Sequence, residues 1–254
     1  MFVDNSSGHS PLSGISTLES TANYSSDYGA LLGAIDRAIA PQWLAANTSG
    51  GGAETDSVIR NTPASVQESA LRALAVNRQQ FEDEAALIAH RLSLLSPSAY
   101  MVLDSMSTGG SPTDPRTQIA TLAYYYLVGD PKSTFLMFFG GESPNTSWTN
   151  HWSPAAAYDI GQPVGTWSVF AQGADPTNAN LTYKIYQRSY ANALVLYKPL
   201  SYNLGQGTGT LSDATATTHQ LNGTYRILNA DGTLSGPVTS VTLRNGEGAI
   251  LIKV

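Results

Sequence analysis

The chain has 254 residues, of which 42% are hydrophobic and only 13% are charged, so it can bury a sizeable core and disorder is not expected. Its formal net charge of −6 and the lack of any Lys/Arg run argue against nucleic-acid binding. The sequence has no cysteine, which excludes disulfides, thiolate catalysis and cysteine–zinc sites, and no apolar stretch has the length of a membrane span or of a secretory h-region.

Apolar runs alternate with helical patterns through residues 1–140. The runs occupy residues 2–3, 43–47, the stretch before Glu68, 98–104 and 132–139. Helical patterns separate them, the clearest being the amphipathic stripe over 81–95, and another helix starts at Asp114. Fully apolar strands that alternate with helices indicate a parallel sheet covered by helices.

Polar side chains end these strands, and they are Asp4, Asn47, Glu68, Asp104 and Glu142. Because the carboxyl ends of parallel strands meet at one edge of the sheet, the sequence predicts a functional site at that edge. Neither a G-x-G-x-x-G after the first strand, nor a P-loop, nor a G-x-S-x-G occurs, which argues against nucleotide-binding and α/β-hydrolase sites. The four histidines are scattered, so a histidine-based metal site is not expected. No cofactor is predicted.

The pattern changes in the second half of the chain. Residues 142–180 form a long aromatic-bearing segment, and from about residue 182 apolar and polar residues alternate between Asn, Asp and Gly turns. Alternation with such turns predicts an antiparallel β-sandwich. The predicted organisation is therefore a barrel-like domain over 1–142, an aromatic-rich connecting loop over 143–181 and a sandwich over 182–254.

Several short segments resemble a known family. Phe-Val-Asp-Asn at 2–5, the run ending at Asn47, Gln-Glu at 67–68 and Val-Leu-Asp at 102–104 are similar to strands four to seven of a TIM-barrel glycoside hydrolase. The segments at 158–163 and 186–199 resemble the junction with the C-terminal β-domain in glycoside hydrolases whose activity is assigned mainly by fold. The resemblance implies a mixed α/β fold: a partial (β/α) TIM-type barrel, strands four to eight, followed by a small antiparallel β-sandwich.

The resemblance also implies roles for the strand-end residues. Strands four and six of such a barrel point across the same mouth. The resemblance implies that Asp4 is the nucleophile and Glu68 the acid/base of a two-carboxylate hydrolysis of O-glycosidic bonds in an oligo- or polysaccharide. The candidate substrate-binding residues are polar or aromatic side chains expected beside these carboxylates, namely Asn5, Asn47, Asp104, Trp148 and Trp152.

Other interpretations of the same residues stay open. Asp4 fits a turn-capping role in Asp-Asn-Ser-Ser, and Glu68 fits an acidic residue at the start of a helix, favoured by the helix dipole. Asp104 also fits a structural role, and Trp148 and Trp152 also fit packing between domains. The alternative function is accordingly a non-catalytic carbohydrate-binding or relic half-barrel protein.

The resemblance covers fewer strands than a full barrel, which needs eight. A start directly before the fourth strand suggests a truncated or alternatively started reading frame. The localisation of the chain stays open, while its full-length relatives are expected to be secreted. A partial barrel exposes two sheet edges, and exposed edges invite pairing with another chain. The resemblance implies a carbohydrate as one partner. The exposed edges predict a second copy of the chain as the other, which makes a homodimer.

Overall fold

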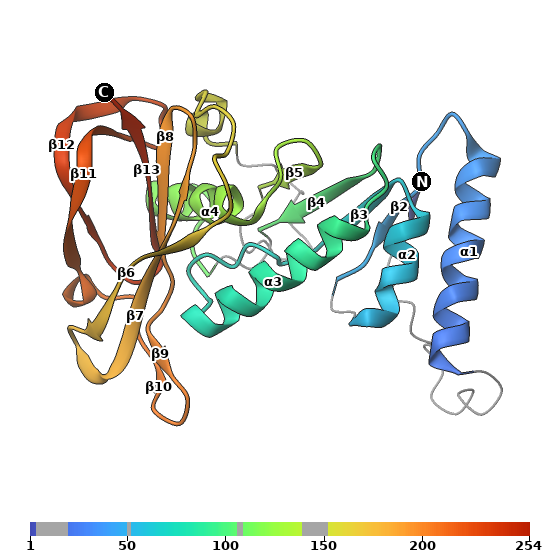
Figure 1. Cartoon of the computed structure of the whole chain (residues 1–254), viewed down its shortest axis with the longest axis horizontal. Helices are drawn as coiled ribbons and strands as arrows, with labels where there is room; N and C mark the ends of the chain where they lie inside the picture. Colours follow the sequence, from blue (N-terminus) through green and yellow to red (C-terminus); the bar gives the residue numbers. More distant parts are fainter. Residues whose placement is uncertain (4–19, 50–51, 106–108, 139–151) are drawn as a thin grey trace. The chain divides into compact units, whose positions relative to one another are not determined.

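The computed structural model describes residues 1–3, 20–49, 52–105, 109–138 and 152–254. Contacts divide the chain into two compact units, whose elements are labelled in Figure 1. Unit one comprises Met1–Ala70, Ala86–Asp104 and Asp130–Met137, and unit two comprises Leu71–Ala85, Ser105–Gly129 and Phe138–Val254. Each unit thus consists of several separate segments of the chain. The domain limits near residues 142 and 182, which come from the sequence pattern, stay a prediction.

Unit one is built on five parallel strands in sequential order, β1 (Phe2–Val3), β2 (Ala45–Asn47), β3 (Ala64–Gln67), β4 (Tyr100–Asp104) and β5 (Thr134–Met137). Parallel neighbours need a crossover between them, and these crossovers carry helices. The helices of unit one are α1 (Thr21–Ile39), the short η2 (Ala53–Thr55), α2 (Asp56–Asn61) and the later turns of α3 (Arg78–Leu94).

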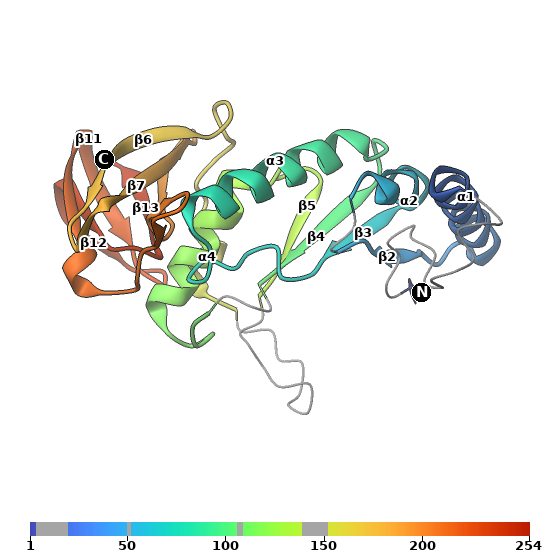
Figure 2. The same cartoon turned by 90° about the horizontal axis from the view of Figure 1, so that it is seen from below.

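Helices α1 and α2 lie side by side and cover part of the sheet (Figures 1 and 2). Helix α1 begins after Ser20, whose Oγ accepts the Asn23 N–H at 3.2 Å, a standard N-cap. A Cβ on Gly29 of α1 would lie 2.7 Å from the Ser57 carbonyl oxygen, so only glycine permits this close helix contact. The core beneath consists of buried apolar side chains from both helices, from β2 and from the residue before β2, namely Leu32, Leu44, Ala46 and Val58.

Unit two contains an antiparallel sheet of eight strands. The strands are β6 (Ser168–Asp175), β7 (Asn178–Ser189), β8 (Ala193–Lys198), β9 (Tyr202–Asn203), β10 (Gly207–Thr208), β11 (Thr217–Leu228), β12 (Leu234–Leu243) and β13 (Glu247–Lys253). Their order is β10-β9-β7-β8-β13-β11-β12, with β6 paired to β7. Two short helices, η3 (Pro154–Ala157) and η4 (Asp213–Thr215), also belong to this unit.

Helix α4 (Pro115–Val128) packs directly on this sheet. A Cβ on Gly248 of β13 would lie 2.5 Å from the Ala123 Cβ and 3.1 Å from the Ile119 carbonyl oxygen, so the glycine lets helix and strand approach closely. At its other end α4 is capped by Arg188, whose Nη1 donates to the carbonyl oxygens of Tyr126 at 3.0 Å and Gly129 at 2.6 Å. A cation at the carboxyl end of a helix is favourable, because it satisfies carbonyls that lack helical partners.

The mixture of helices and strands is as predicted, but the predicted architecture is wrong. In the described residues the five parallel strands form an open run from β1 to β5, which does not identify a TIM-type barrel. The antiparallel strands form one curled sheet and not a sandwich of two.

The curl follows from strand length and register. Strands β7 and β11 have 12 residues each, and β11 shifts register between Gln220 and Tyr225. A bulge of this kind bends a strand, so one sheet can wrap around its own core. Side chains from five strands meet in that core, among them Tyr183, Leu196, Tyr225, Val241 and Leu251.

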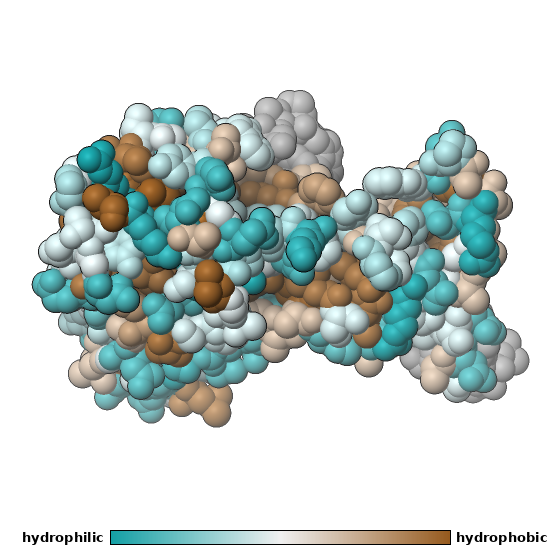
Figure 3. Space-filling model, turned by 45° about the horizontal axis from the view of Figure 1, so that its top comes forward, coloured by the Kyte–Doolittle hydropathy of each residue, from teal (hydrophilic) through white to brown (hydrophobic). Residues whose placement is uncertain are grey.

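The surface carries hydrophobic patches between hydrophilic ones (Figure 3). Large apolar side chains that stay more than half exposed include Trp43, Phe135, Trp152 and Leu204. None of the helices in the described part of the chain is long and apolar enough to cross a membrane.

Candidate functional site

The carboxyl edge of the parallel sheet in unit one gathers the polar strand ends. Asn47 ends β2, Gln67 ends β3 and Asp104 ends β4, and the three strands run in the same direction. Glu68 follows Gln67 directly in a turn. The structure therefore brings Asn47, Glu68 and Asp104 to one edge, as the sequence predicts for parallel strands.

The turn after β3 is held from both neighbouring strands. Asp104 is fully buried, and its Oδ1 accepts the Ser69 N–H at 2.6 Å. Ser49 Oγ, on the loop after β2, accepts the Glu68 N–H. Ser69 has a φ of 55°, a left-handed conformation that is uncommon for a residue other than glycine and that these anchors help to hold. The backbone of Glu68 is consequently fixed on either side.

The carboxylate of Glu68 is available for binding or catalysis. The side chain is half-buried, and within the described residues it makes neither a hydrogen bond nor an ion pair. Helix α3 begins only at Arg78, so Glu68 does not cap it and the helix-dipole interpretation does not apply. A half-buried acid on a fixed turn has the placement that a general acid or base needs.

Asp104 and Asn47 are buried, and each accepts a backbone N–H of this edge. Asp104 anchors the turn of Glu68 from a position that solvent does not reach. Asn47 is 3% exposed, and its Oδ1 accepts the Ser49 N–H at 3.0 Å in a local turn. Both residues therefore position the loops of this edge, which supports the structural interpretation of Asp104.

A buried arginine that is not among the predicted site residues supports the same edge. Arg91 of α3 is 1% exposed; its Nη1 donates to Gln67 Oε1, and its Nη2 donates to Thr55 Oγ1 at 3.4 Å. Gln67 Nε2 in turn donates to Thr48 Oγ1. This chain of contacts ties α3 and the loop after β2 to the end of β3, directly before Glu68. The missed signal was spacing, because Arg91 follows Ile88 by three positions on the buried face of the helix.

Of the remaining predicted site residues, the structure describes only Trp152. Asp4, Asn5 and Trp148 lie outside the described residues. Strand β1, which immediately precedes Asp4 in sequence, ends at Val3 and runs parallel to β2. Trp152 is described, is 55% exposed and belongs to unit two.

No group of three or more His, Asp or Glu side chains in the described residues could hold a metal ion. At the described edge Glu68 presents a carboxylate on a turn held by Asp104 and Ser49. No protein-family model matches the chain, and no curated protein matches it.

Proposed function

We propose that the chain is a glycoside hydrolase that cleaves O-glycosidic bonds in an oligo- or polysaccharide with two carboxylates. The observation that carries the proposal is the half-buried Glu68 carboxylate, which has no partner among the described residues and sits on a turn anchored by Asp104 and Ser49. The second carboxylate is Asp4, which follows β1 in the sequence.

In this proposal the two acids have different roles in the reaction. Glu68 protonates the glycosidic oxygen as the leaving group departs and then deprotonates the attacking water. Asp4 attacks the anomeric carbon, which gives a covalent intermediate and net retention of configuration. Substrate binding by Asn5, Trp148 and Trp152 belongs to the same proposal. Asn47 and Asp104 act through the loops that they hold.

Replacing Glu68 by glutamine is expected to reduce glycan hydrolysis about 100-fold or more, because the amide cannot transfer a proton. Asp4→Asn is expected to have an effect of similar size. A panel of chromogenic glycosides with different sugars and both anomeric forms provides the measurement. Glu84→Gln is the matched control, since Glu84 is also half-buried but lies on α3 in unit two. Full activity in both the Glu68 and the Asp4 variants would refute the assignment.

The alternative is a carbohydrate-binding protein without catalysis. The burial of Asp104 and Asn47 favours it, because neither side chain remains free to extend the catalytic group. In that case glycans bind to the chain, but Glu68→Gln changes their affinity without any hydrolysis in the parent protein.

We also propose a homodimer through unit one. Strands β1 and β5 each pair on one side only within the described residues, and unpaired edges favour association. Beside them Trp43, 62% exposed, stacks on Tyr100, which contacts the 55% exposed Phe135. Light scattering is expected to give twice the chain mass, and Phe135→Lys is expected to shift the protein towards the monomer. A monomer at all concentrations would contradict the proposal.

A further inference from the structure

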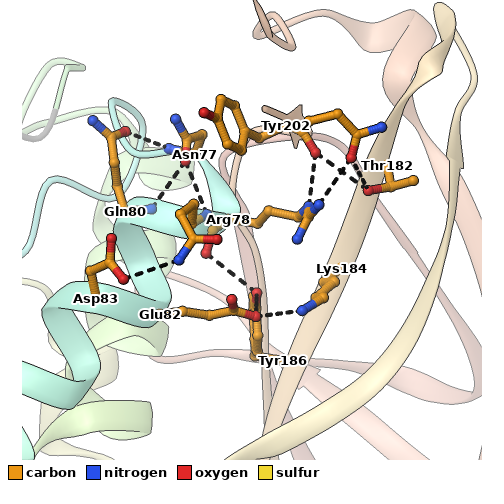
Figure 4. A network of polar contacts seen from close by, with 11 residues as sticks. Asn77, Arg78, Gln80, Glu82, Asp83, Thr182, Lys184, Tyr186 and Tyr202 are labelled. Atoms are coloured by element: carbon orange, nitrogen blue, oxygen red, sulfur yellow. Dashed lines mark hydrogen bonds and ion pairs between the residues drawn. The ribbon is translucent and has the colours of Figure 1, made fainter. Parts of the chain in front are cut away.

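Unit two has an open cavity of about 420 Å³ between the start of α3 and the hairpin β6–β7. In the hairpin Gln172 pairs with Lys184, and Ala174 pairs with Thr182. Since side chains alternate along a strand, these four residues share one face, and all of them line the cavity together with Arg78. Figure 4 shows Arg78 of α3 reaching towards Thr182, with Lys184 farther along the same strand.

Hydrogen bonds hold the start of α3 in place, so Arg78 has a fixed position in the lining of the cavity. Asn77 Oδ1 accepts the N–H groups of Gln79 and Gln80, each at 3.0 Å, and Gln80 Oε1 accepts the Asn77 N–H at 2.9 Å. This reciprocal pattern is a capping box. Arg78 Nε then donates to the Tyr202 carbonyl oxygen at 2.9 Å, and its Nη2 donates to Asn203 Oδ1 at 3.0 Å.

The two cations of the cavity differ in how their charge is balanced. Lys184 Nζ lies 2.6 Å from Glu82 Oε1, which also accepts the Tyr186 hydroxyl at 2.8 Å. Burial acts to raise the pKa of Glu82, but the hydrogen bonds from Lys184 and Tyr186 outweigh it and lower that pKa, so Glu82 stays charged. Arg78 donates hydrogen bonds only to neutral acceptors within the described residues, and the Glu82 charge attracts it without a direct ion pair. Two cations beside one carboxylate therefore leave this side of the cavity with a net positive charge.

From this arrangement we infer an accessory binding site for an acidic sugar, a hexuronate unit of a glycan. The planar guanidinium of Arg78 suits a carboxylate, while the Lys184 charge is balanced by Glu82. Gln172 is exposed and can bond sugar hydroxyls through its amide, while the Thr182 hydroxyl already orders the Arg78 partner Asn203 at 3.0 Å. The anion part of the inference rests on Arg78, and the sugar part rests on the proposed function.

The test is calorimetric titration of the full chain with a uronate oligosaccharide and with a neutral oligosaccharide of the same length. The uronate is expected to bind at least tenfold more tightly, and its affinity is expected to fall with salt because the contact is ionic. To prevent turnover, the titrations use the Glu68→Gln variant. Equal affinity for the two oligosaccharides, or binding that salt does not weaken, would overturn the inference.

Gln172→Glu tests the cavity itself, because it changes a lining residue and leaves the residues that hold the fold unchanged. The new carboxylate lies opposite Lys184 and beside Arg78, so it competes with the ligand and is expected to weaken uronate binding about tenfold. Gln220→Glu is the matched control, because Gln220 is also exposed on a strand, β11, and does not line the cavity. Equal losses in the two variants would show a general charge effect and refute the site.

The outcomes separate this inference from the proposed function. Hydrolysis by the parent chain without preferential uronate binding refutes only the accessory site. Uronate binding that Gln172→Glu weakens, without hydrolysis of any glycoside in the panel, supports the site and refutes only the catalytic assignment.

Discussion

Phe81→Ala is expected to lower the free energy of unfolding by about 3–5 kcal/mol, the usual cost of removing a fully buried phenylalanine ring. Phe81 of α3 is 0% exposed and belongs to unit two. Its ring centroid lies 4.4 Å from that of Tyr186, 4.9 Å from Tyr124 and 5.5 Å from Tyr197. The truncation therefore leaves a cavity lined by rings from a helix and two strands, and rigid rings cannot collapse into it easily.

Chemical denaturation followed by near-ultraviolet circular dichroism measures this effect, because the surrounding tyrosines report directly on the cluster. Leu204→Ala is the control, since Leu204 is 88% exposed in unit two and its removal is expected to cost less than about 1 kcal/mol. A loss at Phe81 no larger than the loss at Leu204 would show that the aromatic cluster does not hold unit two together.

The carboxyl edge of the parallel sheet could be predicted from the sequence for a simple reason. Parallel strands in order place their last residues together, and apolar runs that end in Asn47, Glu68 and Asp104 mark those positions. What each of these side chains does there could not be predicted. Asp104 is buried because it bonds the backbone of Ser69, a partner 35 positions away in the sequence. No local pattern carries that information.

The curled sheet was not predicted, because the alternation of apolar and polar residues along its strands is the same as in a sandwich. Alternation along 183–190 shows which residues face a core, but both architectures bury one face of each strand. The difference lies in the pairing. Strand β8 is buried along its whole length between β7 and β13, and β11 changes register between Gln220 and Tyr225. Such partners become visible only when the strands are placed in space.

The buried polar contacts of unit two could not be predicted from the sequence either, and Lys198 shows why. This lysine is 0% exposed, and its Nζ donates to the carbonyl oxygens of Thr215 at 2.7 Å and Leu243 at 3.2 Å and to Thr217 Oγ1 at 3.0 Å. Burial lowers the pKa of Lys198 to about 8. In the sequence it resembles an ordinary strand-ending cation before Pro199. Its three acceptors come from segments 17 to 45 positions away.

Asp175→Asn is expected to lower the free energy of unfolding by about 2 kcal/mol at neutral pH, with most of the loss tied to its charge. Asp175 is 2% exposed at the end of β6. Its Oδ2 accepts hydrogen bonds from Ser201 Oγ and, at 2.9 Å, from Asn245 Nδ2. Its Oδ1 accepts the N–H and the hydroxyl of Thr177, at 2.8 and 2.6 Å. An asparagine cannot accept all four bonds, so buried donors lose their partner.

The free energy of unfolding should depend on pH in a way that shows the contribution of the Asp175 charge. Burial acts to raise the pKa of Asp175, but the hydrogen bonds from Ser201, Thr177 and Asn245 outweigh it and lower the pKa from 3.8 to about 2. Because the folded-state pKa lies below the unfolded one, the stabilisation is complete above about pH 4 and is lost as the pH falls towards 2. The difference in unfolding free energy between the parent chain and Asp175→Asn is therefore expected to shrink over this interval in denaturation curves.

A second aspartate provides the control. Asp231 accepts the N–H and the hydroxyl of Thr233 at 2.9 and 2.7 Å, the same local turn that Asp175 makes with Thr177. Asp231 is exposed and has no counterpart to the contacts of Asp175 with Ser201 and Asn245 among the described residues. Asp231→Asn should consequently change stability far less at every pH. Equal effects of the two substitutions would mean that the turn alone, and not the buried network joining β6 to the loops before β9 and β13, accounts for the stabilisation.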